Sequence, residues 1–119
     1  MPIKPRSCKN KGARFQKEIK ELIHEHFPEI ERDSLKVAIM GESGVDIHIS
    51  PDVRHRRLPL AIECKNTEKL NIWKAIQQAE SNSGDDGNFP VVFFRRNRTK
   101  PYVVLDAEDF LTILSEATK

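Results

Sequence analysis

Long apolar segments are absent from the sequence, and no run approaches the roughly 20 residues that a membrane-spanning helix requires. The basic, proline-containing N-terminus also lacks the apolar stretch of a secretory signal. Cysteine is scarce, because Cys8 and Cys64 are the only two, and they lie far apart without CxxC or Cys/His spacing. These absences argue against a membrane protein, a disulfide framework and a zinc site, so we expect a soluble, cytoplasmic protein with two free thiols.

Internal repeats and low-complexity segments are absent as well. The 119 residues, of which 38% are hydrophobic, are enough to bury one core. Residues 1–11 show no apolar periodicity, and Gly12 follows them. We therefore predict a flexible basic arm over residues 1–11 and a single domain over residues 12–119.

The charges are unevenly distributed, although the formal net charge is only +2. Glu18 is the only acidic residue among the first twenty, and further basic clusters occupy residues 54–57 and 95–100. Any one cluster could equally serve solubility. Three clusters in so short a chain favour a polyanionic partner.

Apolar periodicity and turn residues predict the element order α-β-β-β-α-β-β-α. The first helix is predicted over Ala13–Phe27, where apolar residues recur at helical spacing and Pro28 follows. A second helix is predicted over Leu70–Ser81, with Trp73 on its buried stripe, and a third over Ala107–Glu116, with Asp106 as its N-cap. The predicted strands are Leu35–Met40, Val45–Ser50, Leu58–Lys65, Phe89–Phe94 and Tyr102–Leu105. The first two strands should form an antiparallel hairpin around the turn at residues 41–44.

Two carboxylates and one lysine are expected to meet on one face of this sheet. Asp46 lies early in the second predicted strand, and Glu63 and Lys65 lie on the same face at the end of the third. Buried carboxylates are costly, and a hard cation such as Mg²⁺ bound by their oxygens offsets that cost. Such a cation can polarise a phosphodiester and acidify a water, while a nearby lysine orients that water or stabilises developing charge. The bare Glu-x-Lys pattern is also typical of an exposed ion pair, but the ordered set favours phosphodiester hydrolysis.

Taken together, Gly44-Val45-Asp46 and Glu63-Cys64-Lys65 resemble the motif of the PD-(D/E)XK nuclease superfamily, although Val45 stands where the family name has proline. Within it, the sequence is most similar to the archaeal and phage-type Holliday junction resolvases, over residues 11–114. The resemblance implies an α/β fold with a restriction-endonuclease-like core, in which helices flank a central mixed sheet and the metal site lies on one sheet face near its edge.

The resemblance also implies roles for individual residues. The segment 11–18 is similar to the family's first helix, whose glutamate contributes to the metal site, so Glu18 would join Asp46 and Glu63 as a metal ligand and Lys65 would assist catalysis. The helix after the motif often carries a glutamine near the lysine. Gln78 is the choice here and Gln77 the alternative, and both could instead be ordinary polar helix residues.

The implied function is Mg²⁺-dependent endonucleolytic hydrolysis of DNA, with Mn²⁺ as a substitute, by a homodimer that resolves four-way junctions. Neither a membrane nor a small-molecule cofactor is expected as a partner. The alternatives are a nuclease for forks, flaps or damaged duplex, since the motif specifies hydrolysis and not substrate shape, and a DNA-binding protein without activity. The residues expected to contact DNA are basic: Lys4, Arg6, Lys9, Lys11, Arg14, Arg95, Arg96, Arg98 and Lys100.

Overall fold

A computed structural model describes residues 5–39, 41–84 and 87–119, with side chains from Asn10 onward. Its elements follow in the order α1 (Pro5–His26), η1 (Arg32–Ser34), β1 (Leu35–Val37), β2 (Ile47–Ile49), α2 (Pro51–Arg56), β3 (Leu60–Asn66), α3 (Ile72–Asn82), β4 (Phe89–Arg95), β5 (Tyr102–Leu105) and α4 (Ala107–Ala117). The predicted order is confirmed, with two short helices, η1 and α2, added to it. None of the described helices is long and apolar enough to cross a membrane.

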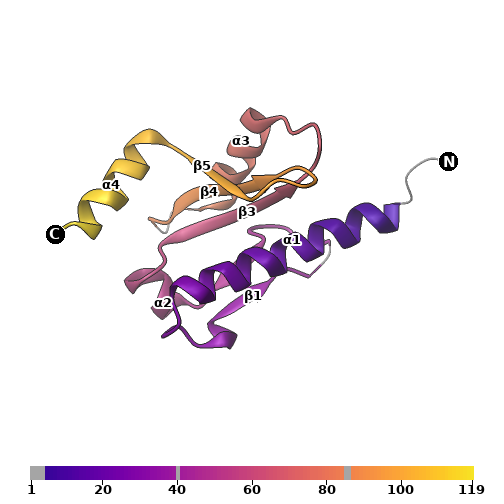
Figure 1. Ribbon diagram of the computed structural model, residues 1–119. Helices are drawn as coiled ribbons and strands as arrows, with labels where there is room; N and C mark the ends of the chain where they lie inside the picture. The colour runs from indigo at the N-terminus through magenta and orange to yellow at the C-terminus, as the bar shows by residue number, and fades with distance from the viewer. Residues whose placement is uncertain (1–4, 40, 85–86) are drawn as a thin grey trace.

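The five strands form one mixed sheet in the order β1-β2-β3-β4-β5 (Figure 1). Strands β3 and β4 are parallel, and the other neighbouring pairs are antiparallel. The crossover between the parallel strands is α3, as a parallel connection requires. The predicted β1–β2 hairpin is confirmed, with Leu35 opposite Ile49. The last residue of its first predicted strand, Met40, lies outside the described residues.

Helices cover the sheet on both faces (Figure 1). On one face, α1 packs Phe15, Ile19 and Ile23 against inward side chains of β2, β3 and β4. These three residues are four positions apart, so they form one stripe of the helix. On the other face, α3 packs Ala75 and Ala79 against Val92 of β4. The α/β class with a central mixed sheet flanked by helices is therefore confirmed.

The first helix begins earlier than the predicted start at Ala13. Residues 5–11 of the predicted arm form its first turns, and residues 1–4 lie outside the described residues. Proline is tolerated in the first turn of a helix, and extending an existing helix costs far less than starting one. An apolar stripe is therefore not needed for these residues to be helical once the stripe from Phe15 onward anchors the helix to the sheet.

Trp73 was predicted to be a core residue, and this prediction is wrong: its side chain is 75% exposed. The stripe of α3 that faces the sheet consists of Ala75 and Ala79. A residue two positions away points about 200° around the helix axis, so burial of Ala75 turns Trp73 outward. Small side chains let the helix approach β4 closely.

Cys64 is a buried free thiol as predicted, and the side chain of Cys8 is outside the described part of the chain.

Candidate active site

Strand β3 carries the central part of the site. It pairs with β4 in parallel register, with Glu63 beside Val92 and Lys65 beside Phe94. Alternation along the strand directs Ile62 and Cys64 to the α1 face, where both belong to the main core. Glu63 and Lys65 therefore lie together on the α3 face. The prediction that these two residues share a face of the sheet is confirmed.

Asp46 directly precedes β2 and is held against β3 by two hydrogen bonds. Its backbone N–H donates to the carbonyl oxygen of Ile62 at 2.8 Å. Its carboxylate oxygen Oδ2 accepts from the backbone N–H of Cys64 at 2.7 Å. Because these bonds flank Glu63, the Asp46 carboxylate lies next to the second acidic residue of the motif. The predicted meeting of Asp46, Glu63 and Lys65 is thus present in the structure.

The two carboxyl groups are in an unfavourable environment for negative charge. Glu63 is only 2% exposed. Burial raises its pKa above the ordinary carboxyl value, and the neighbouring Asp46 carboxylate raises that pKa further. Burial also raises the pKa of Asp46, against the hydrogen bond from Cys64, which lowers it. The Lys65 ammonium Nζ is 3.9 Å from Glu63 Oε2, and it compensates this charge only in part.

Cys64, which lies between Glu63 and Lys65 in the sequence, does not have a reactive thiol. Burial raises the pKa of Cys64 strongly, and the carboxylates of Asp46 and Glu63 add to that effect. A thiolate is therefore not formed near neutral pH, and Cys64 serves as a small apolar core residue whose backbone N–H positions Asp46.

Asn82, at the end of α3, is a site residue that the sequence interpretation missed. Its side-chain nitrogen Nδ2 donates to Glu63 Oε1 at 3.2 Å and to the carbonyl oxygen of Gly44 at 3.1 Å. It thereby connects the helix, the acidic residue and the loop before Asp46. Asn82 follows Ala75 and Ala79 at intervals of four and three residues, so a polar residue continuing the buried stripe was the signal that could have identified it.

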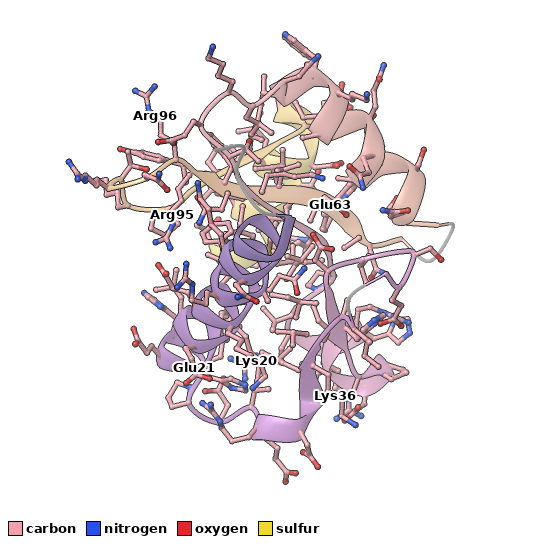
Figure 2. The ribbon with its side chains drawn as sticks, turned by 90° about the vertical axis from the view of Figure 1, so that its right-hand side faces the viewer. Lys20, Glu21, Lys36, Glu63, Arg95 and Arg96 are labelled. Carbon is pink, nitrogen blue, oxygen red and sulfur yellow. The ribbon has the colours of Figure 1, made fainter. Side chains whose placement is uncertain are left out.

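The glutamines and Glu18 are placed apart from this cluster. Gln77 and Gln78 are exposed on α3, and within the described ranges neither side chain makes a hydrogen bond. Glu18 lies on α1 at the opposite face of the sheet, where its Oε2 accepts from Arg95 Nη1 at 2.6 Å. Figure 2 shows Arg95 beside α1 and Glu63 in the interior of the molecule. The structure thus brings together three of the five predicted catalytic residues.

The donor set of the cluster suits a hard divalent cation. In the part of the chain that the structure describes, no three His, Cys, Asp or Glu side chains lie close enough together to hold a metal ion. Mg²⁺, however, is commonly bound by one or two carboxylates, with waters and substrate phosphate oxygens completing its shell. One buried and one partly buried carboxyl group, both with raised pKa values, fit such a cation; among the described residues, Glu63 has an amide and a distant ammonium as its partners.

Several of the predicted DNA-binding residues gather around one polar cavity of about 340 Å³ between α1 and the β4–β5 turn. Its lining residues are Lys11, Arg14, Glu18, Asn66, Arg95, Asn97, Arg98 and Thr99. Arg95 is partly structural, because its guanidinium also lies 4.9 Å from the centre of the Phe15 ring. Arg96 and Lys100 are exposed on the same turn but outside this cavity. Lys4 and the side chains of Arg6 and Lys9 are outside the described residues.

A model of the family described as "Phage putative PDDEXK endonuclease" matches residues 7–119 of this chain. The match covers nearly the whole sequence, and the chain therefore belongs to this PD-(D/E)XK endonuclease family. No curated protein and no solved structure matches it.

Proposed function

We propose that this protein is a metal-dependent endonuclease that hydrolyses DNA phosphodiester bonds with Mg²⁺, and with Mn²⁺ as a substitute. The observation that carries the proposal is the pair of carboxyl groups formed by the partly buried Asp46 and the buried Glu63, with the Lys65 ammonium 3.9 Å from Glu63. Membership of a PD-(D/E)XK endonuclease family supports it. A purely structural ion cluster would not need a second carboxylate, Asp46, that raises the cost of ionising Glu63.

The residues have distinct roles in this proposal. Asp46 and Glu63 would hold the cation, which supplies polarisation of the phosphodiester and acidification of a bound water. Lys65 would orient the attacking water or stabilise the charge that develops on the phosphate. Asn82 would keep Glu63 in place through its hydrogen bond, and Gln78 stays a candidate for contacting phosphate from the exposed side of α3.

The proposed substrate is a four-way DNA junction, and the proposed assembly is a homodimer, because the sequence resembles junction resolvases and a two-fold enzyme can cut two opposed strands. Apolar side chains exposed on α4 support an association surface: Phe110, Leu111 and Leu114. Forks, flaps and damaged duplexes are the alternative substrates, since the site chemistry does not depend on DNA shape.

A cleavage assay tests the activity and its substrate together. End-labelled four-way junction, fork, flap and linear duplex of equal length are incubated with the protein in Mg²⁺, Mn²⁺, Ca²⁺ or excess chelator. We expect cleavage with the first two ions, little with Ca²⁺, whose coordination is longer and looser, and none with chelator. Full activity in chelator would contradict the metal mechanism, and equal cutting of all four DNAs would contradict junction selectivity.

Three variants test the residues: Asp46→Asn, Glu63→Gln and Lys65→Ala. Each should abolish cleavage but leave DNA affinity largely intact, because these groups act on the transition state and not on backbone docking. Glu80→Gln, an exposed carboxylate on α3, is the matched control and should cleave normally. Loss of folding in all three site variants would indicate a structural cluster instead.

The cavity between α1 and the β4–β5 turn is the proposed path of a DNA backbone. Lys11→Gln and Arg98→Asn should each weaken binding and flatten the slope of log affinity against log salt by about one unit per lost contact. Asparagine is chosen at position 98 because that residue has a positive φ of 66°, which asparagine tolerates well. Lys36→Gln, at the exposed position of the edge strand β1, is the control. Unchanged slopes in both variants would mean that DNA runs elsewhere.

A further inference from the structure

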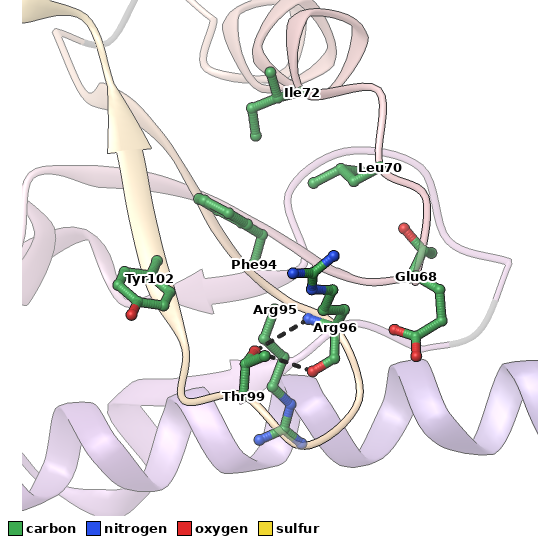
Figure 3. Close-up of a pocket in the computed structure, with 9 residues that line it drawn as sticks. Glu68, Leu70, Ile72, Phe94, Arg95, Arg96, Thr99 and Tyr102 are labelled. Carbon is green, nitrogen blue, oxygen red and sulfur yellow. Dashed lines mark hydrogen bonds between the residues drawn. The ribbon is translucent and has the colours of Figure 1, made fainter.

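A second cavity, of about 550 Å³, is lined partly by the residues that follow the Glu63-Cys64-Lys65 motif along the chain (Figure 3). It lies between the residues that lead into α3, the ends of β4 and β5 and the turn that joins these strands. The lining residues used here are Leu70, Ile72, Phe94, Arg96, Thr99 and Tyr102. The proposed function does not use this cavity, although its walls begin at Thr67, two residues after Lys65.

The sheet register connects this cavity to the site. Lys65 is the partner of Phe94 in the parallel pair, and Phe94 is the partner of Tyr102 in the antiparallel pair. Directly paired residues share a sheet face, and neighbouring strands are about 4.8 Å apart. Lys65, Phe94 and Tyr102 therefore form a row across three strands, on the face that also carries Glu63. A phosphate at Lys65 would have its neighbouring nucleotide above Phe94 and Tyr102.

The walls combine aromatic rings with three charged residues: Arg95, Arg96 and Glu68, whose carboxylate accepts from the backbone N–H of Asn97. The rings of Phe94 and Tyr102 are tilted by 34°, with their centres 6.2 Å apart, and Tyr102 is 53% exposed. Figure 3 shows the Arg96 guanidinium directed between Phe94 and Glu68, whereas Arg95 points toward α1. Throughout the described chain, the Arg96 side chain makes no ion pair or hydrogen bond. Its backbone is held by two hydrogen bonds with the Thr99 hydroxyl, at 3.0 and 3.3 Å, and by one from the Thr99 backbone N–H at 3.2 Å.

Aromatic faces beside an unpaired guanidinium are the chemistry with which proteins bind an unstacked nucleobase and its phosphate. The cavity is of ordinary ligand-binding size, whereas a paired base inside a duplex could not enter it. Lys100, whose ammonium lies over the Tyr102 ring at 5.6 Å from its centre, adds positive charge beside that ring. These features favour an anionic, aromatic occupant over an uncharged apolar segment of another protein.

We propose that this cavity receives an unpaired nucleotide next to the scissile phosphate, so that the enzyme selects DNA in which a base has left the stack at the cut. The proposal rests on the proposed nuclease function, and it names the local feature that branched, flapped and damaged DNA share. Phe94 and Tyr102 stack on the base, and Arg96 binds its phosphate.

The test uses a linear duplex and the same duplex with one unpaired 2-aminopurine, a base whose fluorescence is quenched by stacking. Cleavage with Mg²⁺ gives the ratio of kcat/KM for the two DNAs, and Asp46→Asn protein gives the fluorescence change on binding. Wild type should favour the unpaired substrate, and Tyr102→Ala should reduce that ratio about tenfold or more, which is the size of one base–aromatic stack. Tyr102→Phe keeps the ring and should keep the ratio. Val103→Ala, on the same strand but the opposite face, is the truncation control.

The outcomes separate this proposal from the nuclease function. If the two DNAs are cut with equal kcat/KM, and Tyr102→Ala does not change that ratio, the nucleotide pocket is overturned. The proposed nuclease function is unaffected by this result. A fluorescence change that Tyr102→Ala abolishes supports the pocket, even if no DNA is cut and the proposed nuclease function fails. A change of oligomeric state in Tyr102→Ala, with unaltered selectivity, overturns the pocket in favour of a surface for a second copy of the chain.

Discussion

Replacement of Glu63 by glutamine should make the metal-free protein more stable, although it removes a fully buried residue of the candidate site. Glu63 is 2% exposed, and within the described part of the chain its carboxylate has only the Asn82 amide at 3.2 Å and the Lys65 ammonium at 3.9 Å as partners. Glutamine has nearly the same volume, so no cavity forms, and its Oε1 can still accept from Asn82. The substitution therefore removes a poorly compensated charge and little else.

The expected gain is about 1–2 kcal/mol in the free energy of unfolding at pH 8, the order of the net cost of burying a polar group that its partners compensate only in part. For a chain of this size such a gain raises the melting temperature by about 4–8 °C. The sign is opposite to the usual cost of substituting a buried side chain, which is typically destabilising by 0.5–3 kcal/mol.

The pH dependence follows from the raised pKa values of Asp46 and Glu63. Because the folded carboxyl groups hold their protons to higher pH than the unfolded ones, the folded state binds more protons between the two values. Their contribution to stability is full below the ordinary carboxyl range near pH 4, and it is lost as the pH rises through the raised pKa values. Stability of the wild type should fall over that window, and that of Glu63→Gln should fall less, since only Asp46 remains.

Thermal unfolding followed by circular dichroism measures these effects in EDTA at pH 5 and pH 8, with Glu80→Gln as the exposed control. A Mg²⁺ titration follows. A cation that binds only the folded state at a hundred times its dissociation constant stabilises by about 2.7 kcal/mol, and Glu63→Gln should lose most of this gain. A Glu63→Gln protein that melts below the wild type in EDTA at pH 8 would refute the reasoning, because the carboxylate would then be a structural partner.

Three further predictions concern the positioning of the site and the stability of the fold. Asn82→Ala should lower kcat more than Gln78→Ala does, because Asn82 donates a hydrogen bond to Glu63 whereas Gln78 is exposed; equal effects in steady-state kinetics would contradict this assignment. Phe15→Ala should destabilise the fold by about 3–5 kcal/mol in urea unfolding, since the ring is 0% exposed, and a loss below 1 kcal/mol would argue against the packing of α1 on the sheet. Asp106→Ala should cost about 1 kcal/mol in the same measurement, because Asp106 Oδ1 accepts from the backbone N–H of Asp109 at the start of α4.

Periodicity alone identified most elements and the order in which they follow. Strand β5 coincides with its predicted bounds, and Asp106 is the N-cap of α4 as predicted. These features depend on side-chain alternation and on capping chemistry, which are local and therefore readable from sequence. The first turns of α1 were missed because they have no apolar stripe, and α2 was missed because Val53 among its six residues is too little to form one.

The motif residues were equally accessible, because strand alternation puts Glu63 and Lys65 on one face whatever the rest of the chain does. The meeting of Asp46 with Glu63 depended on an assumed pairing of two neighbouring strands, which the structure contains. Strand alternation and the pairing of two neighbouring strands were thus enough to predict that Asp46, Glu63 and Lys65 lie close together.

Only the tertiary structure decided which side chains surround that motif. The rotation of α3 about its own axis places Asn82 at Glu63 and leaves Trp73, Gln77 and Gln78 exposed. That rotation is set by the close packing of Ala75 and Ala79 on β4, a long-range contact that helical periodicity by itself leaves open.

The same distinction explains Glu18 and the cavity beside the site. Helical spacing put Glu18 on α1, but the face of the sheet that α1 covers determines that it pairs with Arg95 and not with Glu63. The row from Lys65 through Phe94 to Tyr102 exists because β3, β4 and β5 are adjacent and in this register. Sequence determined which residues each strand presents, and the order and register of strands far apart in the chain determined which of them became neighbours, because pairing is a property of the whole sheet.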